Sequence, residues 1–154
     1  MPRDHGIRQI ISGGQTGVDR GALDAAIALG IPHGGHCPRG RRAEDGRIPP
    51  RYCLTECESA RYAARTELNV LSADATMILC RGPLSGGTKL TEKLARRHAK
   101  PCLIVDLDEP PASDTIHAWL AANRVSILNI AGPRESQSPG IQEGARDYLL
   151  ALLR

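Results

Sequence analysis

Short aliphatic runs alternate along this chain with segments whose apolar residues recur at helical spacing. The aliphatic runs predict buried strands at Arg8–Ser12, Ala75–Cys80, Pro101–Asp106 and Val125–Ala131. Apolar residues at every third or fourth position predict helices at Val18–Leu29, Ser59–Ser72, Thr88–Ala99, Asp114–Ala122 and Ile141–Leu153. Residues 33–56 are rich in Gly, Pro, Arg and His and predict a long irregular segment around at most one short strand. Segments of that length in a compact domain are usually functional or mobile.

Continuous aliphatic strands separated by helices are typical of a parallel sheet with helices on both faces. We therefore expect an α/β fold, with residues 1–154 forming one ligand-binding domain. Ligands of such sheets bind beyond the carboxyl ends of the strands. The chemically unusual loops should then follow strands, and three of them do.

The amino-acid composition argues against several classes of function. Lys and Arg number 20 against 17 Asp and Glu, a net charge of +3 that argues against a dedicated nucleic-acid binder. With no Phe, one Trp and three Tyr, the chain lacks the stacking platform of a single-strand binder. No apolar run approaches the roughly 20 residues of a membrane span. The five cysteines form no regular framework, so we expect reduced thiols and a cytoplasmic protein.

The first loop of interest is Gly13–Gly17, between the first strand and the first helix. Its glycines permit a tight turn and close approach to a ligand, and the N–H groups at the helix start should face an anion. Thr16 and Gln15 add polar side chains, although the loop could also be a plain turn with Thr16 as helix cap. Asp19 and Arg20 follow, and Asp19 could accept from a ligand N–H, hold Arg20, or simply stabilise the helix start.

A second glycine loop, Leu84–Thr88, and a third polar loop, Gly132–Gly140, follow two other strands. Ser85 or Thr88 could cap a helix, and Arg134 could bind a phosphate or form a surface ion pair with Glu135. If these corners converge, their N–H groups would surround one electropositive hollow. In these loops and the helix turn after the first, the candidate ligand-binding residues are Gly13, Gly14, Gln15, Thr16, Gly17, Asp19, Arg20, Ser85, Gly86, Gly87, Thr88, Arg134, Glu135 and Ser136.

The long segment carries several arginines between residues 39 and 51, with Glu44 and Asp45 among them. It is either a solvated, partly self-neutralised loop or a lid that places one or two arginines on an anionic ligand. His33, His36 and Cys37 hint at a metal site, but no second Cys/His cluster has zinc-ligand spacing, so we predict no metal site.

The run ISGGQTGVDRGALDAA at residues 11–26 closely resembles the opening motif of the putative molybdenum carrier family. Further stretches are similar to that family: Cys37–Gly46, Arg65–Val70, Gly86–Thr88 and Asn129–Ser136. The resemblance covers nearly the whole chain. The wider superfamily is Rossmann-like and includes the lonely-guy phosphoribohydrolases and DNA-processing protein A.

The resemblance implies a doubly wound domain with a mostly parallel sheet of five to six strands, assembled as a dimer or tetramer. It also implies a pocket for a phosphate-bearing ligand, the molybdenum cofactor (molybdopterin carrying molybdate) or a nucleotide-like molecule. Asp19, Glu44 or Asp45 would then accept from pterin N–H groups. The phosphoribohydrolase relatives use an arginine, to which Arg65 corresponds, and a glutamate soon after their glycine turn. The resemblance therefore adds Arg65 to the candidate ligand-binding residues.

Three functions compete at this point. A carrier would bind its ligand without turnover, in keeping with the lack of a recognisable nucleophile. A nucleotide hydrolase would use Arg65 for orientation and Glu67 or Glu92 as acid and base. Leu90 and Thr91 stand where the relatives have the acid, which argues against hydrolysis. The third candidate function is that of a nucleotide-sensing or DNA-binding module.

Overall fold

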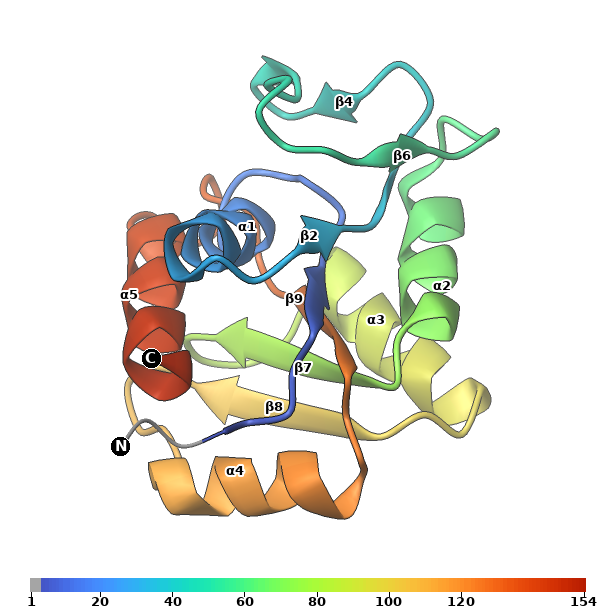
Figure 1. Ribbon diagram of the computed structural model, residues 1–154. Coiled ribbons are helices and arrows are strands. Elements are labelled where there is room, and N and C mark those ends of the chain that lie inside the picture. Colours follow the sequence, from blue (N-terminus) through green and yellow to red (C-terminus); the bar gives the residue numbers. More distant parts are fainter. Residues whose placement is uncertain (1–3) are drawn as a thin grey trace.

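The computed structural model describes residues 4–154 and is built around a five-stranded sheet. The strands are β1 (Gln9–Ile11), β2 (His33–Gly34), β7 (Ala75–Cys80), β8 (Cys102–Asp106) and β9 (Ile127–Ala131), in the order β2-β1-β9-β7-β8. Every pair in this sheet is parallel, as the continuous aliphatic runs predicted. All six residues of β7 are buried, because the strand has neighbours on both sides and helices on both faces (Figure 1).

Five helices cover the sheet: α1 (Val18–Leu29), α2 (Tyr62–Ser72), α3 (Gly86–Arg97), α4 (Ser113–Ala122) and α5 (Ile141–Leu153). The apolar sides of α1, α4 and α5 share the main core cluster with the sheet. α2 and α3 form a smaller cluster around Val70 and Leu94, and Figure 1 places them opposite α1 and α5. The neighbouring strands β9 and β7 therefore lead into helices on opposite faces, which makes their carboxyl ends a topological switch point.

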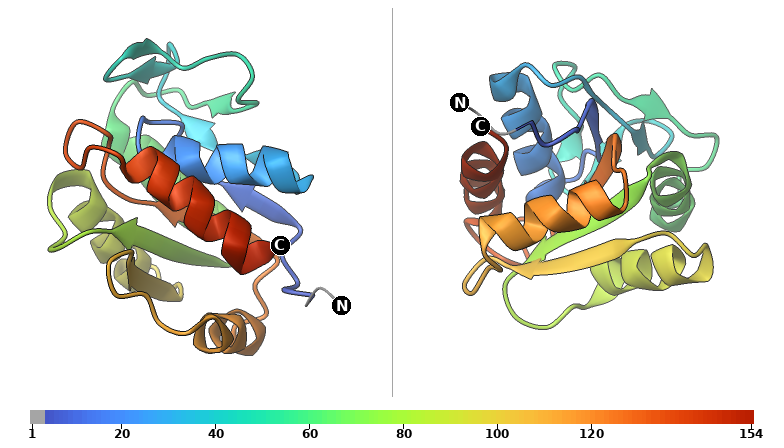
Figure 2. Two further views of the ribbon diagram at one scale, coloured as in Figure 1. Left: turned by 90° about the vertical axis from the view of Figure 1, so that its left-hand side faces the viewer. Right: turned by 60° about the horizontal axis from the view of Figure 1, so that its bottom comes forward.

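α1 and α5 lie side by side, as the left-hand view of Figure 2 shows. Gly21 permits this close packing, because a Cβ there would lie 2.4 Å from the carbonyl oxygen of Gln142. The two helices that follow the first and third loops are thereby held against each other. No helix within residues 4–154 is long and apolar enough to cross a membrane.

Residues 36–56, which we call the cover segment, form a layer beyond the sheet, at the top of Figure 1. The segment contains β3 (His36–Cys37), β4 (Arg42–Ala43), β5 (Gly46–Arg47) and β6 (Thr55–Glu56). β3 pairs with β6, and β4 pairs with β5 as a hairpin. The prediction of at most one short strand in this region is therefore wrong. Each of these strands is only two residues long, which is too short to show an alternation of apolar and polar residues.

The cover segment has a small core of its own. Cys37, Ile48 and Tyr52 are fully buried against Leu23 of α1. The Arg41 guanidinium donates to the carbonyl oxygens of Ile48, Pro49 and Tyr52 and so ties the segment together from inside.

Two helix starts differ from the prediction by more than one residue. α2 begins at Tyr62 and not at Ser59, because the Ser59 hydroxyl accepts from the Arg61 N–H and its carbonyl accepts from Arg39 of the cover segment. α3 begins two residues before Thr88, at Gly86, with Ser85 as its N-cap.

Candidate functional site

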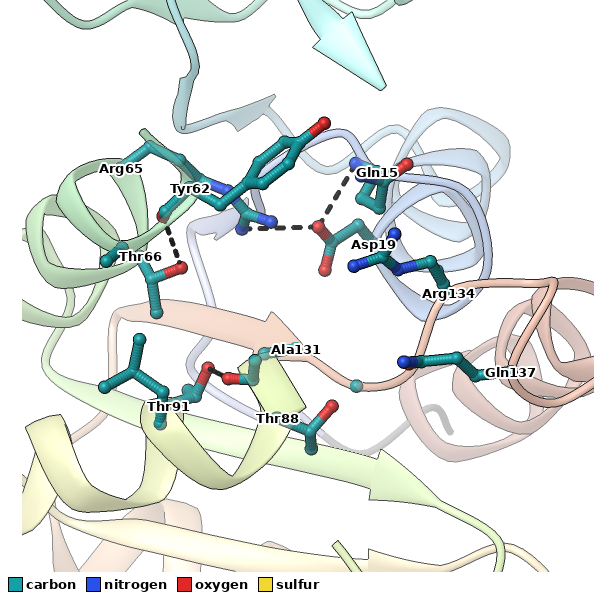
Figure 3. A pocket seen from close by; sticks show the side chains of 14 residues that line it. Gln15, Asp19, Tyr62, Arg65, Thr66, Thr88, Thr91, Ala131, Arg134 and Gln137 are labelled. Carbon is teal, nitrogen blue, oxygen red and sulfur yellow. Dashed lines mark hydrogen bonds and ion pairs between the residues drawn. The ribbon is translucent and has the colours of Figure 1, made fainter. Parts of the chain in front are cut away.

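A polar cavity of about 80 Å³ lies where the loops after β1 and β9 meet the first turns of α2 and α3 (Figure 3). That volume has room for several water molecules, and so for a compact polar group. Its lining is formed by Gln15, Asp19, Tyr62, Ala63, Arg65, Thr66, Gly87, Thr88, Leu90, Thr91, Ala131, Gly132, Arg134 and Gln137. All three loops singled out in the sequence contribute to it.

A buried ion pair forms one wall of this cavity. Arg65 of α2 places Nη1 3.5 Å from Oδ2 of Asp19, which also accepts from the Gln15 N–H at 3.2 Å. The Arg65 Nε is buried without a hydrogen-bond partner among the described residues. Burial raises the pKa of Asp19 above its ordinary value, although the Arg65 charge and the Gln15 N–H oppose this. Asp19 is therefore a carboxyl group that holds a proton more readily than usual, beside a fixed positive charge.

Gly13 makes room for this pair. A Cβ at Gly13 would lie 1.8 Å from Nη1 of Arg65, so the guanidinium lies directly against the glycine backbone. Gly17 has the same kind of role between loops, since a Cβ there would lie 2.3 Å from the carbonyl oxygen of Pro133. Both positions therefore require glycine because a side chain there would collide with the part of the chain that packs against it.

The N–H groups of the first loop donate to side chains of the protein itself, so the prediction that they face an anion is wrong. Thr16 donates its N–H to the side-chain oxygen of Gln15 at 3.0 Å, and Gly17 donates to that of Gln142 at 3.2 Å. The Gly14 N–H reaches the Ser12 hydroxyl at 3.5 Å. Side-chain acceptors from the loop itself and from α5 thus satisfy the donors that were expected to face an anion.

The second loop differs, because its donors are less used. Gly87 and Thr88 line the cavity at the start of α3. The N–H groups of Gly86 and Gly87 have no acceptor inside the helix, whereas the Thr88 N–H donates to the Ser85 carbonyl oxygen at 3.2 Å. The Thr88 hydroxyl makes no hydrogen bond among the described residues, whereas Thr91 donates back to the Gly87 carbonyl oxygen at 2.9 Å. Ser85 and Gly86 are exposed and lie outside the lining.

In the third loop, Arg134 and Gln137 line the cavity. Glu135 turns away and accepts from the N–H groups of Gly140 at 2.6 Å and Gln142 at 3.0 Å. Its carboxylate therefore stabilises the positive end of α5 and does not face the cavity.

Next to the cavity, the hairpin of β4 and β5 reaches the loops through its two turn residues, Glu44 and Asp45. Glu44 accepts from the Thr16 hydroxyl and from both the N–H and the hydroxyl of Ser136, at 3.2 and 2.5 Å. Its own N–H donates to the Gln15 side chain at 2.9 Å. Thr16 and Ser136, predicted to bind a ligand, are thus occupied by a carboxylate of the chain itself.

Arg20 is also taken up by the hairpin. Its Nη1 and Nη2 donate to the two oxygens of Asp45 at 2.6 and 2.8 Å, and its Nε donates to the Gly14 carbonyl oxygen. The bidentate pair lowers the pKa of Asp45. No arginine between residues 39 and 51 lines the cavity, and Arg39, Arg42, Arg47 and Arg51 are exposed, as expected for a solvated loop. The interpretation as a lid that brings arginines to the site is therefore not supported, because it is the acidic turn residues that reach the loops.

The proposed acids of a hydrolase lie elsewhere. Glu67 contacts the His98 ring at 3.2 Å, and Glu92 pairs with Arg96 at 3.3 Å. Neither lines the cavity, so the hydrolase hypothesis loses both of its candidates. Within residues 4–154 no three His, Cys, Asp or Glu side chains are grouped so as to hold a metal ion.

Sequence reasoning missed several lining residues, among them Tyr62, Thr66, Thr91 and Gln137. Thr66 and Thr91 each lie one helical turn beyond another lining residue, so helical periodicity applied from Tyr62 and Gly87 would have found them. The candidate residues that line the cavity are Gln15, Asp19, Arg65, Gly87, Thr88 and Arg134. The candidates outside the lining are Gly13, Gly14, Thr16, Gly17, Arg20, Ser85, Gly86, Glu135 and Ser136.

A parallel sheet with helices on both faces and a polar cavity at its switch point defines a Rossmann-like α/β domain. The chain belongs to the circularly permutated YpsA SLOG family, which matches residues 10–153. A crystal structure described as a putative molybdenum carrier protein from Syntrophus aciditrophicus is 47% identical, with a TM-score of 0.92 over 96% of this chain and 95% of that one. No protein with a curated description matches. The predicted fold and family are confirmed.

Proposed function

We propose that this protein binds a small phosphate-bearing ligand in the cavity, and that the ligand is the molybdenum cofactor, which it carries or stores. The observation that carries the proposal is a cavity in which two arginines, Arg65 and Arg134, stand with the free hydroxyl of Thr88 around a buried carboxyl group. Guanidinium and hydroxyl donors are the groups that bind phosphate. The similarity to a protein named a putative molybdenum carrier supports this ligand among other phosphate-bearing molecules.

The residues fit the organic part of such a ligand. Arg65 and Asp19 both line the cavity, so the Arg65 guanidinium can donate to the ligand, and the Asp19 carboxyl group beside it can accept from a ring N–H. Because the described residues group no three metal-ligating side chains, molybdenum would be held as an oxyanion or within the organic ligand, through hydrogen bonds.

Co-elution with isolated molybdenum cofactor tests the proposal. After gel filtration at a several-fold ligand excess, molybdenum and pterin should leave the column with the protein. Arg65→Gln should weaken retention tenfold or more, because losing a charged hydrogen-bonding group in a partly buried site costs about 1.5–3 kcal/mol. Arg61→Gln, at an exposed arginine just before α2, is the matched control and should behave like the wild type.

The proposal is wrong if neither molybdenum nor pterin co-elutes, or if Arg65→Gln, still folded by thermal unfolding, retains as much as the wild type. Nucleoside monophosphates added as competitors separate the alternative, a nucleotide-sensing site, from the carrier. The homo-oligomer, a dimer or tetramer, and the cytoplasmic location stay predictions, and size-exclusion chromatography with light scattering tests the first.

A further inference from the structure

The Glu44 carboxylate sits in a set of donors typical of an oxyanion site. Thr16 of the first loop and Ser136 of the third loop donate to it through two hydroxyls and one backbone N–H. Arg134 Nε lies 3.9 Å from Oε2 of the same carboxylate. Burial opposes ionisation, but these hydrogen bonds and the Arg134 charge outweigh it and lower the pKa of Glu44. The groups around the Glu44 carboxylate thus favour a negative charge at this position.

This position adjoins the cavity. Arg134 lines the cavity and also contacts Glu44, and Gln15 lines the cavity while its side chain accepts from the Glu44 N–H. A ligand in the cavity would therefore need to extend only past Arg134 to reach Thr16 and Ser136.

We propose that Thr16, Ser136 and Arg134 form a second anion subsite of the ligand-binding site, and that Glu44 occupies it in the ligand-free protein. The subsite takes a tetrahedral oxyanion group, phosphate or molybdate, once the Glu44 side chain has turned away. The inference rests on the proposed function and adds to it that the ligand carries two anionic groups, one for the Arg65 cavity and one for this subsite.

The hairpin can release Glu44 without leaving the domain. Asp45, the other turn residue, holds the hairpin to α1 through its two hydrogen bonds with Arg20. The hydrogen bond from the Glu44 N–H to Gln15 involves the backbone and not the Glu44 carboxylate. Exchange of carboxylate for ligand therefore needs only a side-chain rotation at the hairpin tip. A tethered carboxylate competes at a high effective concentration, so its removal should raise the affinity for a free anion.

Calorimetric titration with inorganic phosphate and, separately, with molybdate tests this inference. Glu44→Ala should bind at least one of the two anions tenfold or more tightly than the wild type, and Glu44→Gln, which keeps the side-chain length but not the charge, should fall between them. Adding Ser136→Ala to Glu44→Ala should abolish the gain. Glu56→Ala is the matched control, because Glu56 belongs to the same segment but accepts from the Gly40 N–H at 2.7 Å.

The outcomes separate this inference from the proposed function. If the wild type retains molybdenum cofactor in an Arg65-dependent way but Glu44→Ala and Glu44→Gln bind phosphate and molybdate no better than the wild type, only the second subsite is refuted. If neither variant nor the wild type binds any of these ligands, both proposals fail. A gain that survives Ser136→Ala also overturns the subsite, because the anion would then bind elsewhere.

Discussion

At the scale of single residues, the glycines of the first loop act through the space they leave. The sequence predicted these positions, but it assigned their N–H groups to a ligand. Those groups are instead satisfied by side chains such as Gln142, which is far away in the sequence. A pattern of glycines shows where another part of the chain comes close. The partner of each N–H donor depends instead on tertiary packing, which the local spacing of residues does not contain.

Gly13→Ala should therefore weaken ligand retention although it replaces no ligand-binding side chain. A Cβ 1.8 Å from Nη1 of Arg65 forces the guanidinium out of its place and separates it from Asp19. We expect a loss of tenfold or more in the co-elution assay, similar to that of Arg65→Gln. Gly34→Ala, in the neighbouring strand β2, is the control, since its Cβ would meet only the flexible end of Gln9. Equal retention by Gly13→Ala and the wild type would contradict the positioning role.

At the scale of elements, the packing of α1 on α5 fixes the two loops that flank the cavity. The sequence predicted both helices with their observed ends, because apolar periodicity of that length is a strong signal. The sequence did not predict the strands of the cover segment. These strands are two residues long and are held in place by the hydrogen bonds of Arg41 and by a small core around Tyr52. Glu44 and Asp45 reach the site only because that hairpin forms, so their contacts could not follow from periodicity.

Gly21→Ala and Gly144→Ala make a matched test of this packing. At Gly21 the new Cβ would lie 2.4 Å from a backbone oxygen of α5, so we expect a loss of about 1–3 kcal/mol in the free energy of unfolding. At Gly144, inside α5, it would meet only the end of the Arg81 side chain, at 2.9 Å, and alanine favours the helix by up to about 1 kcal/mol. Urea unfolding measures both, and equal effects of the two substitutions would show that the contact at Gly21 does not limit the packing.

At the scale of the whole molecule, acid should act in opposite directions on the cavity and on the cover segment. The pKa of Asp19 is raised by burial, so the folded protein takes up this proton more readily than the unfolded chain does. Its protonation favours the folded state, a contribution present at low pH and lost as the pH rises through the folded pKa. The pKa values of Glu44 and Asp45 are lowered from 4.5 and 3.8, so their contributions are present above those values and lost as the pH falls through the folded pKa values.

Below about pH 4, we therefore expect the cover segment to open while the sheet stays folded. Hydrogen exchange, expressed as protection factors to remove the pH dependence of the chemistry, should show protection lost at residues 36–56 before β7 and β9. Asp45→Asn should produce the same local opening at neutral pH, because it removes the charge that pairs with Arg20. Asp108→Asn, which breaks a more exposed pair with Arg81, should leave the segment closed. Simultaneous loss of protection in the segment and the sheet would contradict this prediction, because the hairpin would then unfold only together with the domain. Glu44 would in that case leave the anion subsite by rotation of its side chain alone.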